Sequence, residues 1–375
     1  MENWSSCERL LVIRPDNIGD VLMSSPAIRA IKRQFGSRIT LLTSQSGAEA
    51  SALLPEVDET LVANFPWVKH GTTIRPTHLA AIVSRLKKAR FDGCVIFTVY
   101  SQNPLPTAMV PWMAGIPRRL AYCRENPYQL LTYWVPDDEP YAKIRHQVVR
   151  DLDLVEHVGA YSTDDRITVT VPPEADSAAM AKLARVGVTT DRPFVIFHAG
   201  VSEAKRRFPE VDWIELARRV LTTHAVQVIF TGSAVEQALT DHLQLTCGKN
   251  TFSAAGLLDI QEFAAVIRQA AVVVSVNTAT IHLAAALGRP LVVLYALTNP
   301  QHTPWRCPHT LFPYSVSDEK RSRNEVIRHV DHSLYSEKRD RPSVDELLRA
   351  ITVLLDGQRL SEPIYQGLFH QSKIG

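Results

Sequence analysis

Short runs of aliphatic and β-branched residues alternate with helix-like segments along the chain, and this alternation restricts the fold more than any other feature. In the first half it predicts strands at residues 10–14, 39–43, 93–99 and near 118–123, and helices at 21–35, 78–90 and 146–159. Strands that alternate with helices form βαβ units, in which the strands are parallel and helices cover both faces of the sheet. The pattern therefore predicts an α/β fold.

The second half repeats this rhythm. It predicts strands at 194–197, 226–231, 272–276 and 291–297, and helices at 212–223, 234–245, from 259, at 278–287 and at 343–355. A chain of 375 residues exceeds the size at which a single core stops growing, about 250–300 residues. We therefore expect two domains, at residues 1–165 and 166–345, followed by a C-terminal helix and tail at 346–375.

Two stretches fit this rhythm poorly. Residues 160–176 are predicted to link the halves, with a candidate strand at 168–171 and Pro172-Pro173 as a break. Residues 317–342 are highly charged and show no clear apolar periodicity. We interpret them as a solvated surface insertion, and a flap over the active site is the alternative.

Composition excludes several classes of protein. Hydrophobic residues make up 45% and charged residues 21%, and the formal net charge is +2, which does not favour nucleic-acid binding. The five cysteines lack metal-ligand spacing, so we expect no metal site and a reduced, cytoplasmic setting. We predict neither a signal peptide nor a membrane span.

Three polar loops follow predicted strands, where ligands of open α/β sheets gather. The first runs from Arg14 to Asp20, and Asp20 is a candidate general base; the alternative is that Asp20 only caps the next helix. The second is His198 to Pro209, with the consecutive cations Lys205, Arg206 and Arg207, which suit phosphate unless they are an ordinary surface charge run.

The third loop, Asn277 to His282, opens a helix directly after an apolar strand. Its backbone amides and hydroxyls would face a phosphate at the positive end of that helix, and ordinary Ser/Thr capping is the alternative. The chain contains neither GxGxxG nor GxxxxGK[ST], which disfavours a nicotinamide oxidoreductase and a P-loop enzyme.

These loops, in this order, resemble glycosyltransferase family 9, the ADP-heptose:lipopolysaccharide heptosyltransferases. The resemblance rests on residues 11–28, 146–159, 198–209, 230–236 and 275–300, and it covers about residues 10–305. It implies a GT-B fold of two Rossmann-like domains with the site between them. It also implies an inverting, metal-independent transfer of a sugar from a nucleotide donor, with no cofactor.

The resemblance assigns roles to individual residues. It implies Asp20 as the base, and Asn17, Gly19, Arg118 and Arg119 are expected on the acceptor side. The implied donor-binding residues are Ser202, Lys205, Arg206, Glu236, Asn277, Thr278, Ala279, Thr280 and His282.

The chain departs from the family pattern at three places. Asn277, Ala279 and Phe208 stand where Asp, Gly and Trp are usual. A neutral Asn277 repels a diphosphate less than Asp does, so the identity of the donor is open.

The expected donor is ADP-heptose, and the expected acceptor is a lipopolysaccharide core or another glycan or lipid-linked molecule. Peripheral attachment to the inner face of the inner membrane is a further expectation, whereas a nucleic-acid partner is not expected. Two other functions stay open: a non-hydrolysing nucleotide-sugar epimerase, and a nucleotide-sugar-binding protein without activity.

Overall fold

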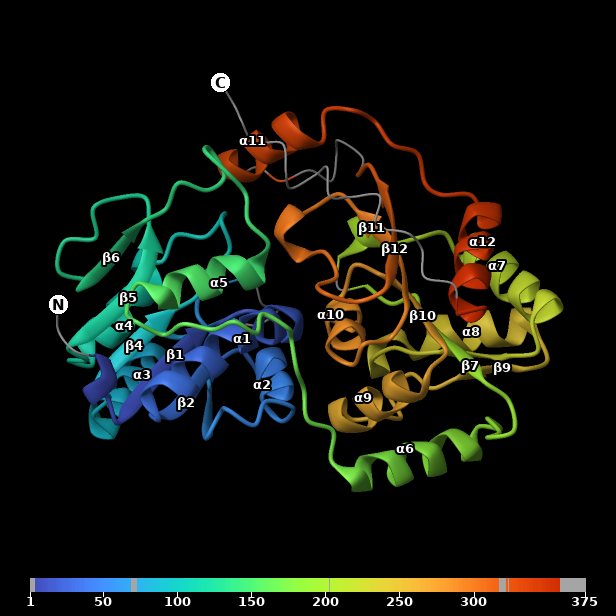
Figure 1. Cartoon of the computed structure of the whole chain (residues 1–375), viewed down its shortest axis with the longest axis horizontal. Coiled ribbons are helices and arrows are strands. Elements are labelled where there is room, and N and C mark those ends of the chain that lie inside the picture. Colours follow the sequence, from blue (N-terminus) through green and yellow to red (C-terminus); the bar gives the residue numbers. More distant parts are fainter. Residues whose placement is uncertain (1–3, 69–72, 202, 317–321, 323, 358–375) are drawn as a thin grey trace. The chain divides into compact units, whose positions relative to one another are not determined.

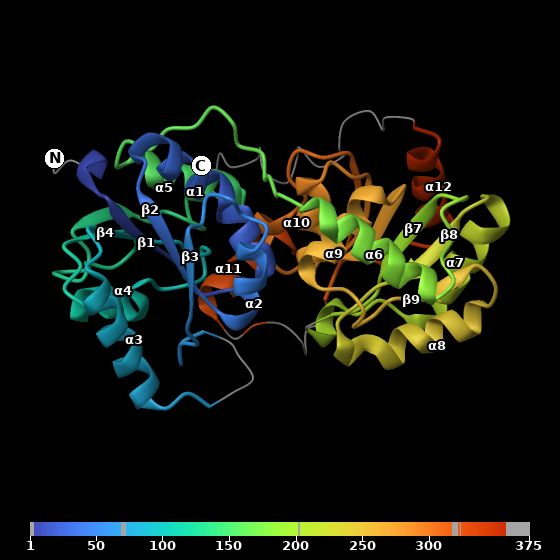
Figure 2. The same cartoon turned by 90° about the horizontal axis from the view of Figure 1, so that it is seen from below.

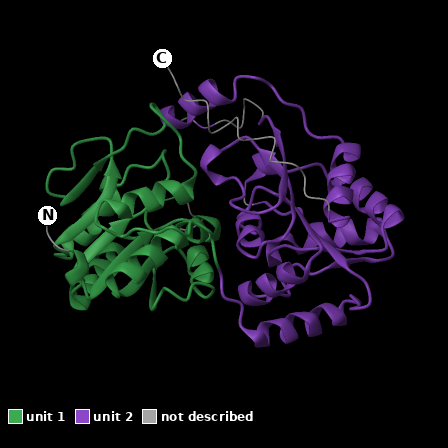
Figure 3. Cartoon of the chain, viewed as in Figure 1, with its two compact units in different colours: residues 1–168, 372–375 green, residues 169–371 purple. Residues whose placement is uncertain are grey.

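The computed structural model describes residues 4–68, 73–201, 203–316, 322 and 324–357. Within them the chain divides into two compact units, the first ending at Thr168 and the second beginning at Val169 (Figure 3). The division expected from the sequence lay between residues 165 and 166.

Unit 1 is built on a six-stranded sheet in which all neighbouring strands are parallel, in the order β3-β2-β1-β4-β5-β6 (Figure 1). The strands are β1 (Arg9–Arg14), β2 (Arg38–Thr43), β3 (Glu59–Val62), β4 (Gly93–Ile96), β5 (Arg118–Cys123) and β6 (Tyr133–Pro136). The helices are α1 (Ile18–Phe35), α2 (Gln45–Ser51), α3 (Pro76–Ala89), α4 (Leu105–Met113) and α5 (Gln147–Glu156).

Helices cover both faces of this sheet. The α3 and α4 helices pack on one face, where Leu11 and Ile13 of β1 join the core with Leu86 and Ala108. The α1 and α5 helices lie together on the other face (Figure 2). Because all strands run parallel, their carboxyl-terminal ends lie at one edge. We call it the carboxyl edge of the sheet.

Unit 2 has a second parallel six-stranded sheet, in the order β12-β11-β10-β7-β8-β9. Its strands are β7 (Phe194–His198), β8 (Gln227–Phe230), β9 (Thr251–Ser253), β10 (Val272–Val276), β11 (Leu291–Ala296) and β12 (His309–Tyr314). Its helices are α6 (Pro173–Arg185), α7 (Glu210–Thr223), α8 (Gln237–Cys247), α9 (Ile260–Gln269), α10 (Ala279–Ala286), α11 (Glu325–Leu334) and α12 (Val344–Leu355). The α7 and α12 helices share one hydrophobic core with β7, β8, β10 and β11.

The structure corrects two expectations. Residues 168–171 form no strand, and the expected break at Pro172-Pro173 is the start of α6, with Pro173 in its first turn. Part of the expected surface insertion is the helix α11, in which Val330 is fully buried and Asp331 largely so. Residues 317–321 and 323 lie outside the described residues.

Candidate functional site

Asp20 lies in the first turn of α1, at the carboxyl edge of the unit 1 sheet. Asn17 is the N-cap of this helix, and the Asp20 Oδ2 atom accepts a hydrogen bond from the Asn17 backbone amide at 3.2 Å. The other oxygen, Oδ1, accepts one from Arg14 Nη2 at 3.1 Å. Asn17, and not Asp20, is therefore the N-cap; the Asp20 carboxylate caps the helix from its third position and also carries an ion pair.

Arg14, the last residue of β1, forms ion pairs with the carboxylates of Asp16 and Asp20. Its side chain is completely buried, and its Nε atom lies 3.3 Å from Asp16 Oδ2 while Nη2 contacts Asp20. Gln102 Nε2 donates to Asp16 Oδ1 at 2.7 Å. Burial outweighs the attraction of Arg14 and raises the pKa of Asp16 to about 6. This loop thus holds a carboxylate that titrates near neutral pH beside Asp20.

A third carboxylate, Asp151, enters this cluster from α5. It is buried and accepts hydrogen bonds from Ser24 Oγ at 2.6 Å and Gln147 Nε2 at 2.8 Å. Burial raises its pKa, and Arg14 is the largest influence in the opposite direction. The helix of Asp20 and α5 are therefore joined through buried polar groups as well as apolar packing.

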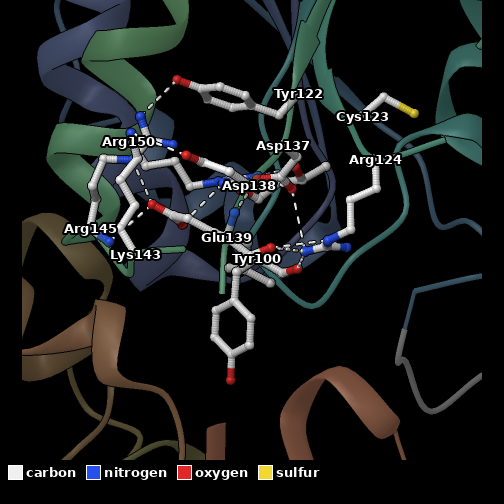
Figure 4. A network of polar contacts seen from close by, with 12 residues as sticks. Tyr100, Tyr122, Cys123, Arg124, Asp137, Asp138, Glu139, Lys143, Arg145 and Arg150 are labelled. Atoms are coloured by element: carbon white, nitrogen blue, oxygen red, sulfur yellow. Dashed lines mark hydrogen bonds and ion pairs between the residues drawn. The ribbon is translucent and has the colours of Figure 1, made fainter. Parts of the chain in front are cut away.

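Arg150 of α5 organises a second buried network at the same edge (Figure 4). Its Nη1 and Nη2 atoms grip the Asp137 carboxylate at 2.8 and 2.9 Å, and Nη1 also contacts Glu139 Oε2 at 3.0 Å. Its Nε atom donates to the Thr98 carbonyl at 3.0 Å, beyond the end of β4. Arg145 pairs with the other Glu139 oxygen. Sequence reasoning missed this network, because no local spacing links residues 137–139 to residue 150.

In unit 2 the candidate donor-binding residues come together at the carboxyl edge of the sheet. Arg206, in a 3-10 turn after β7, donates from Nη1 to the Asn277 backbone carbonyl at 2.9 Å. Lys205 Nζ and Arg206 Nη2 lie 3.3 and 3.6 Å from Glu203 Oε2. Both cationic side chains remain about one quarter exposed. Ser202 lies outside the described residues.

Glu236 sits against two glycines at this edge. A Cβ atom on Gly200 or on Gly232 would run into the Glu236 carboxylate, so both backbones approach it closely. Its Oε2 atom accepts hydrogen bonds from the amide and the hydroxyl of Ser233 at 2.7 and 2.9 Å. His198 lies nearby, and burial lowers its pKa to about 4, so it is neutral at physiological pH.

Asn277 follows β10, and its side chain forms hydrogen bonds within the protein. Its Nδ2 atom donates to the Ala296 carbonyl at 3.0 Å and to Thr298 Oγ1 at 3.2 Å, and its Oδ1 accepts from the Ala296 amide at 3.2 Å. These contacts join the loop to the end of β11. Asn277, which stands where Asp is usual, thus supplies a hydrogen-bond donor that a carboxylate lacks.

Thr278 is the N-cap of α10 and makes no side-chain capping hydrogen bond. Ala279 and Thr280 occupy the first turn, with the Thr280 side chain buried. His282 is buried one turn further along, with its ring near that of His302. The loop thus opens a helix directly after β10, as the sequence predicted, and the binding of an anion at this helix start stays a prediction.

The structure does not bring the two expected acceptor-side arginines to Asp20. Arg118 and Arg119 begin β5, so they lie at the opposite edge of the parallel sheet. Arg119 is buried and donates to the carbonyls of Leu130 and Gln129 at 2.8 and 2.7 Å. It thus serves the fold, and only Asn17 and Gly19, which lie in the Asp20 loop, share the location of the expected base.

Two features are absent from the residues that the structure describes. These residues contain no group of three or more His, Cys, Asp or Glu side chains arranged to hold a metal ion. None of their helices combines the length and the apolar character that a bilayer span needs.

Known proteins resemble this chain in sequence and in fold. The model of a family described as glycosyltransferase family 9 (heptosyltransferase) matches residues 79–331. Lipooligosaccharide heptosyltransferase 2 of Haemophilus influenzae is 25% identical over 315 residues, which cover 79% of this chain and 85% of that protein. Lipopolysaccharide heptosyltransferase 2 of Escherichia coli is also 25% identical, over 311 residues with the same coverage.

Solved structures share the two-sheet architecture. A family 9 glycosyltransferase from Veillonella parvula superimposes with a TM-score of 0.75 at 16% identity, covering 95% of this chain and 99% of that one. E. coli ADP-heptose lipopolysaccharide heptosyltransferase II gives 0.70 at 21% identity, with coverages of 94% and 100%. This is the GT-B fold expected from the sequence, and the matches do not favour the epimerase or the inactive binding protein.

Proposed function

Since the chain belongs to glycosyltransferase family 9, the heptosyltransferase family, we propose that it transfers a heptose or a related sugar from an ADP-sugar to a hydroxyl of a lipopolysaccharide-core or other surface-glycan acceptor. The names of its relatives support this acceptor class. A solved E. coli heptosyltransferase that holds ADP-2-deoxy-2-fluoro heptose supports the donor class. The observation that carries the proposal is the placement of Asp20 at the carboxyl edge of unit 1.

In the proposed reaction Asp20 takes the proton of the acceptor hydroxyl while that oxygen attacks the anomeric carbon. The bond from this carbon to the diphosphate breaks, and the anomeric configuration inverts. Asp20 suits this role because its carboxylate is partly exposed and is held by Arg14 and by the Asn17 amide. A general base of this kind contributes typically about 10²–10⁴-fold to the rate.

Unit 2 is proposed to bind the nucleotide diphosphate. Negative charge grows on the leaving phosphate, and Lys205, Arg206 and the first amides of α10 are the groups that would stabilise it without a metal ion. Glu236 is proposed to bind the ribose hydroxyls. Arg206 and α10 are already joined, because the guanidinium donates to the Asn277 carbonyl directly before the helix.

The deciding experiment compares the wild type with Asp20→Asn. ADP-heptose and a heptose-deficient lipopolysaccharide core serve as substrates, with kcat measured by release of ADP. We expect at least a ~10²-fold loss, because the amide cannot accept the proton. Asp138→Asn is the matched control, since Asp138 is a half-exposed carboxylate that pairs with Lys143.

Wild-type turnover in a folded Asp20→Asn protein would contradict the role of Asp20. Retention of configuration at the anomeric carbon, measured by NMR of the product, would contradict the inverting mechanism. Activity that disappears in EDTA and returns with a divalent cation would contradict metal independence. Conversion of the nucleotide sugar without any acceptor would support an epimerase instead.

A further inference from the structure

A compact apolar patch lies on the outer surface of α4 in unit 1. Met109, Trp112 and Met113 are 46%, 45% and 38% exposed, and their spacing places all three on one side of the helix. The opposite side of α4 packs on the sheet through Ala108 and Val110. The patch therefore faces away from the core, and we call these three side chains the α4 patch.

Cations border the α4 patch. The neighbouring helix α3 covers the same face of the sheet, and the two helices are in contact (Figure 2). Lys87 and Lys88 in its last turn are exposed, as is Arg90 directly after it. The sequences of α3 and α4 contain no acidic residue.

One ion pair fixes which side of α3 faces α4. Arg85 Nη2 lies 3.7 Å from Glu59 Oε1 of β3, the strand at the end of the sheet away from β4 and β5. Lys87 follows two residues later, about 200° around the helix. It therefore lies on the other side of α3, the side nearest α4.

The lysines of α3 and the α4 patch also lie at the same height along their helix axes. Both helices connect parallel strands, so they run antiparallel to the sheet and their last turns lie at the same edge. Lys87 and Lys88 are in the last turn of α3, and Trp112 and Met113 are in the last turn of α4. Apolar and cationic side chains thus share one outward surface.

We propose that this surface of α3 and α4 docks on an anionic phospholipid bilayer. Aromatic and apolar side chains that enter the headgroup region, with cations attracted to acidic lipids, are the two contributions that bind peripheral proteins to membranes. Tryptophan in particular is enriched at this interface. The helices lie flat against the bilayer in this arrangement, so the carboxyl edge that carries Asp20 stands beside the membrane surface.

A second copy of the chain fits the same surface less well. In a symmetric dimer the patch would meet itself, and the two-fold axis would place Lys87 and Lys88 of the two copies on opposite sides of the contact. The two helices offer these lysines no acidic partner there, whereas an acidic lipid surface attracts them. The charge of the surface therefore favours acidic lipid.

The test is sedimentation of the full chain with vesicles of phosphatidylethanolamine and phosphatidylglycerol, and separately with phosphatidylcholine alone. We expect the wild type to sediment with the acidic vesicles and to be released by salt. Trp112→Ser/Met113→Ser and Lys87→Glu/Lys88→Glu should each lower the partition coefficient at least tenfold. The matched control is Val235→Ser/Leu245→Ser, which removes two exposed apolar side chains from unit 2.

Turnover of a soluble acceptor by the patch variants should stay at the wild-type level, which separates this result from the proposed activity. The proposal is overturned if the wild type ignores acidic vesicles, or if both patch variants bind them as well as the wild type. It is also overturned if sedimentation velocity shows a wild-type dimer that the patch variants dissociate while their vesicle binding is unchanged.

Discussion

Three carboxylates meet one buried guanidinium beneath the Asp20 loop. Arg14 attracts the Asp16 carboxylate, and it also pairs with Asp20. Asp151 adds a third negative group from α5. Burial is the main cause of the raised pKa values of Asp16 and Asp151, and the attraction of Arg14 offsets it only in part.

Asp16 gives a prediction about pH. Its pKa rises from 3.8 to about 6 on folding, mainly because of burial, so the folded state holds the proton more tightly. Stability from this group is present below about pH 4 and is lost as the pH rises through 6, by about 3 kcal/mol in total. Asp16→Asn removes this dependence. Urea unfolding should therefore show the variant gaining stability relative to the wild type between pH 4.5 and pH 7.5; a constant difference would contradict the assignment.

Asn277 gives a second prediction at the residue scale. Asn277→Asp keeps the acceptor for the Ala296 amide, but it loses both donated hydrogen bonds and places a carboxylate against the Ala296 carbonyl. We expect a loss of about 1–3 kcal/mol at pH 8. The loss should shrink at pH 4.5, where the buried carboxyl is protonated and donates again. Asn126→Asp, at an exposed turn, is the control; equal stability of wild type and Asn277→Asp at pH 8 would show that these contacts matter little.

Residue roles were only partly predictable from the sequence. Asp20 and Asn277 were singled out because each lies in a segment that follows a strand the sequence marks clearly, and their functional roles stay predictions. The Asn277 side-chain amide bonds to the end of β11, about twenty residues further along the chain. No local sequence pattern shows this contact. The same limit applies to Arg119, whose sequence neighbour Arg118 suggested an anion site while its own partners are backbone carbonyls.

At the scale of elements, α5 combines buried apolar residues with buried polar contacts. Asp151 and Gln147 face the Asp20 loop, and Arg150 holds Asp137 at the end of β6. The helix thus fixes both the first strand and the last strand of the sheet at their carboxyl ends. Arg150 is buried together with the carboxylates of Asp137 and Glu139, so removal of Arg150 leaves these charges uncompensated.

Arg150→Ala tests this element. The change leaves the Asp137 and Glu139 carboxylates buried with fewer partners, and we expect a loss of about 3–5 kcal/mol in unfolding free energy. Arg166→Ala is the control, because that guanidinium is exposed and pairs at the surface, where such pairs contribute about 0–1 kcal/mol. Urea denaturation followed by circular dichroism measures both. Similar losses of unfolding free energy in the two variants would mean that the buried network contributes no more to stability than a surface ion pair.

Elements were predictable where their local pattern was strong. The strands β1, β2, β7, β10 and β11 are rich in aliphatic and β-branched residues, and all five were predicted. Several others were not predicted, namely β3, β6, β9, β12, α2, α4 and α11. Two of them show the physical reason. The β3 strand is a short edge strand with one buried residue, and α11 buries only a narrow side among many charged residues. The start of α6 was read as a break, because Pro173 suits a helix start as well as a turn.

At the scale of the whole molecule, the two units are separate in structure. Each has its own parallel sheet and its own helices, and the described contacts divide between Thr168 and Val169. Arg29 of α1 explains why unit 1 extends to residue 168. Its guanidinium binds the Thr168 hydroxyl at 2.6 Å and the Arg166 carbonyl at 2.7 Å, so this segment is fastened to the first unit.

Units with separate cores should respond separately to a ligand that binds one of them. If unit 2 binds the donor nucleotide, ADP at about 100 times its dissociation constant adds about 2.7 kcal/mol to the stability of that unit. Hydrogen exchange followed by mass spectrometry should then slow in β7, β10 and α10 but not in β1 or β4. Arg206→Ala should abolish the slowing, whereas Arg207→Ala, which removes the exposed neighbouring cation, should keep it. Equal slowing of β1, or full slowing in Arg206→Ala, would assign the nucleotide to other residues.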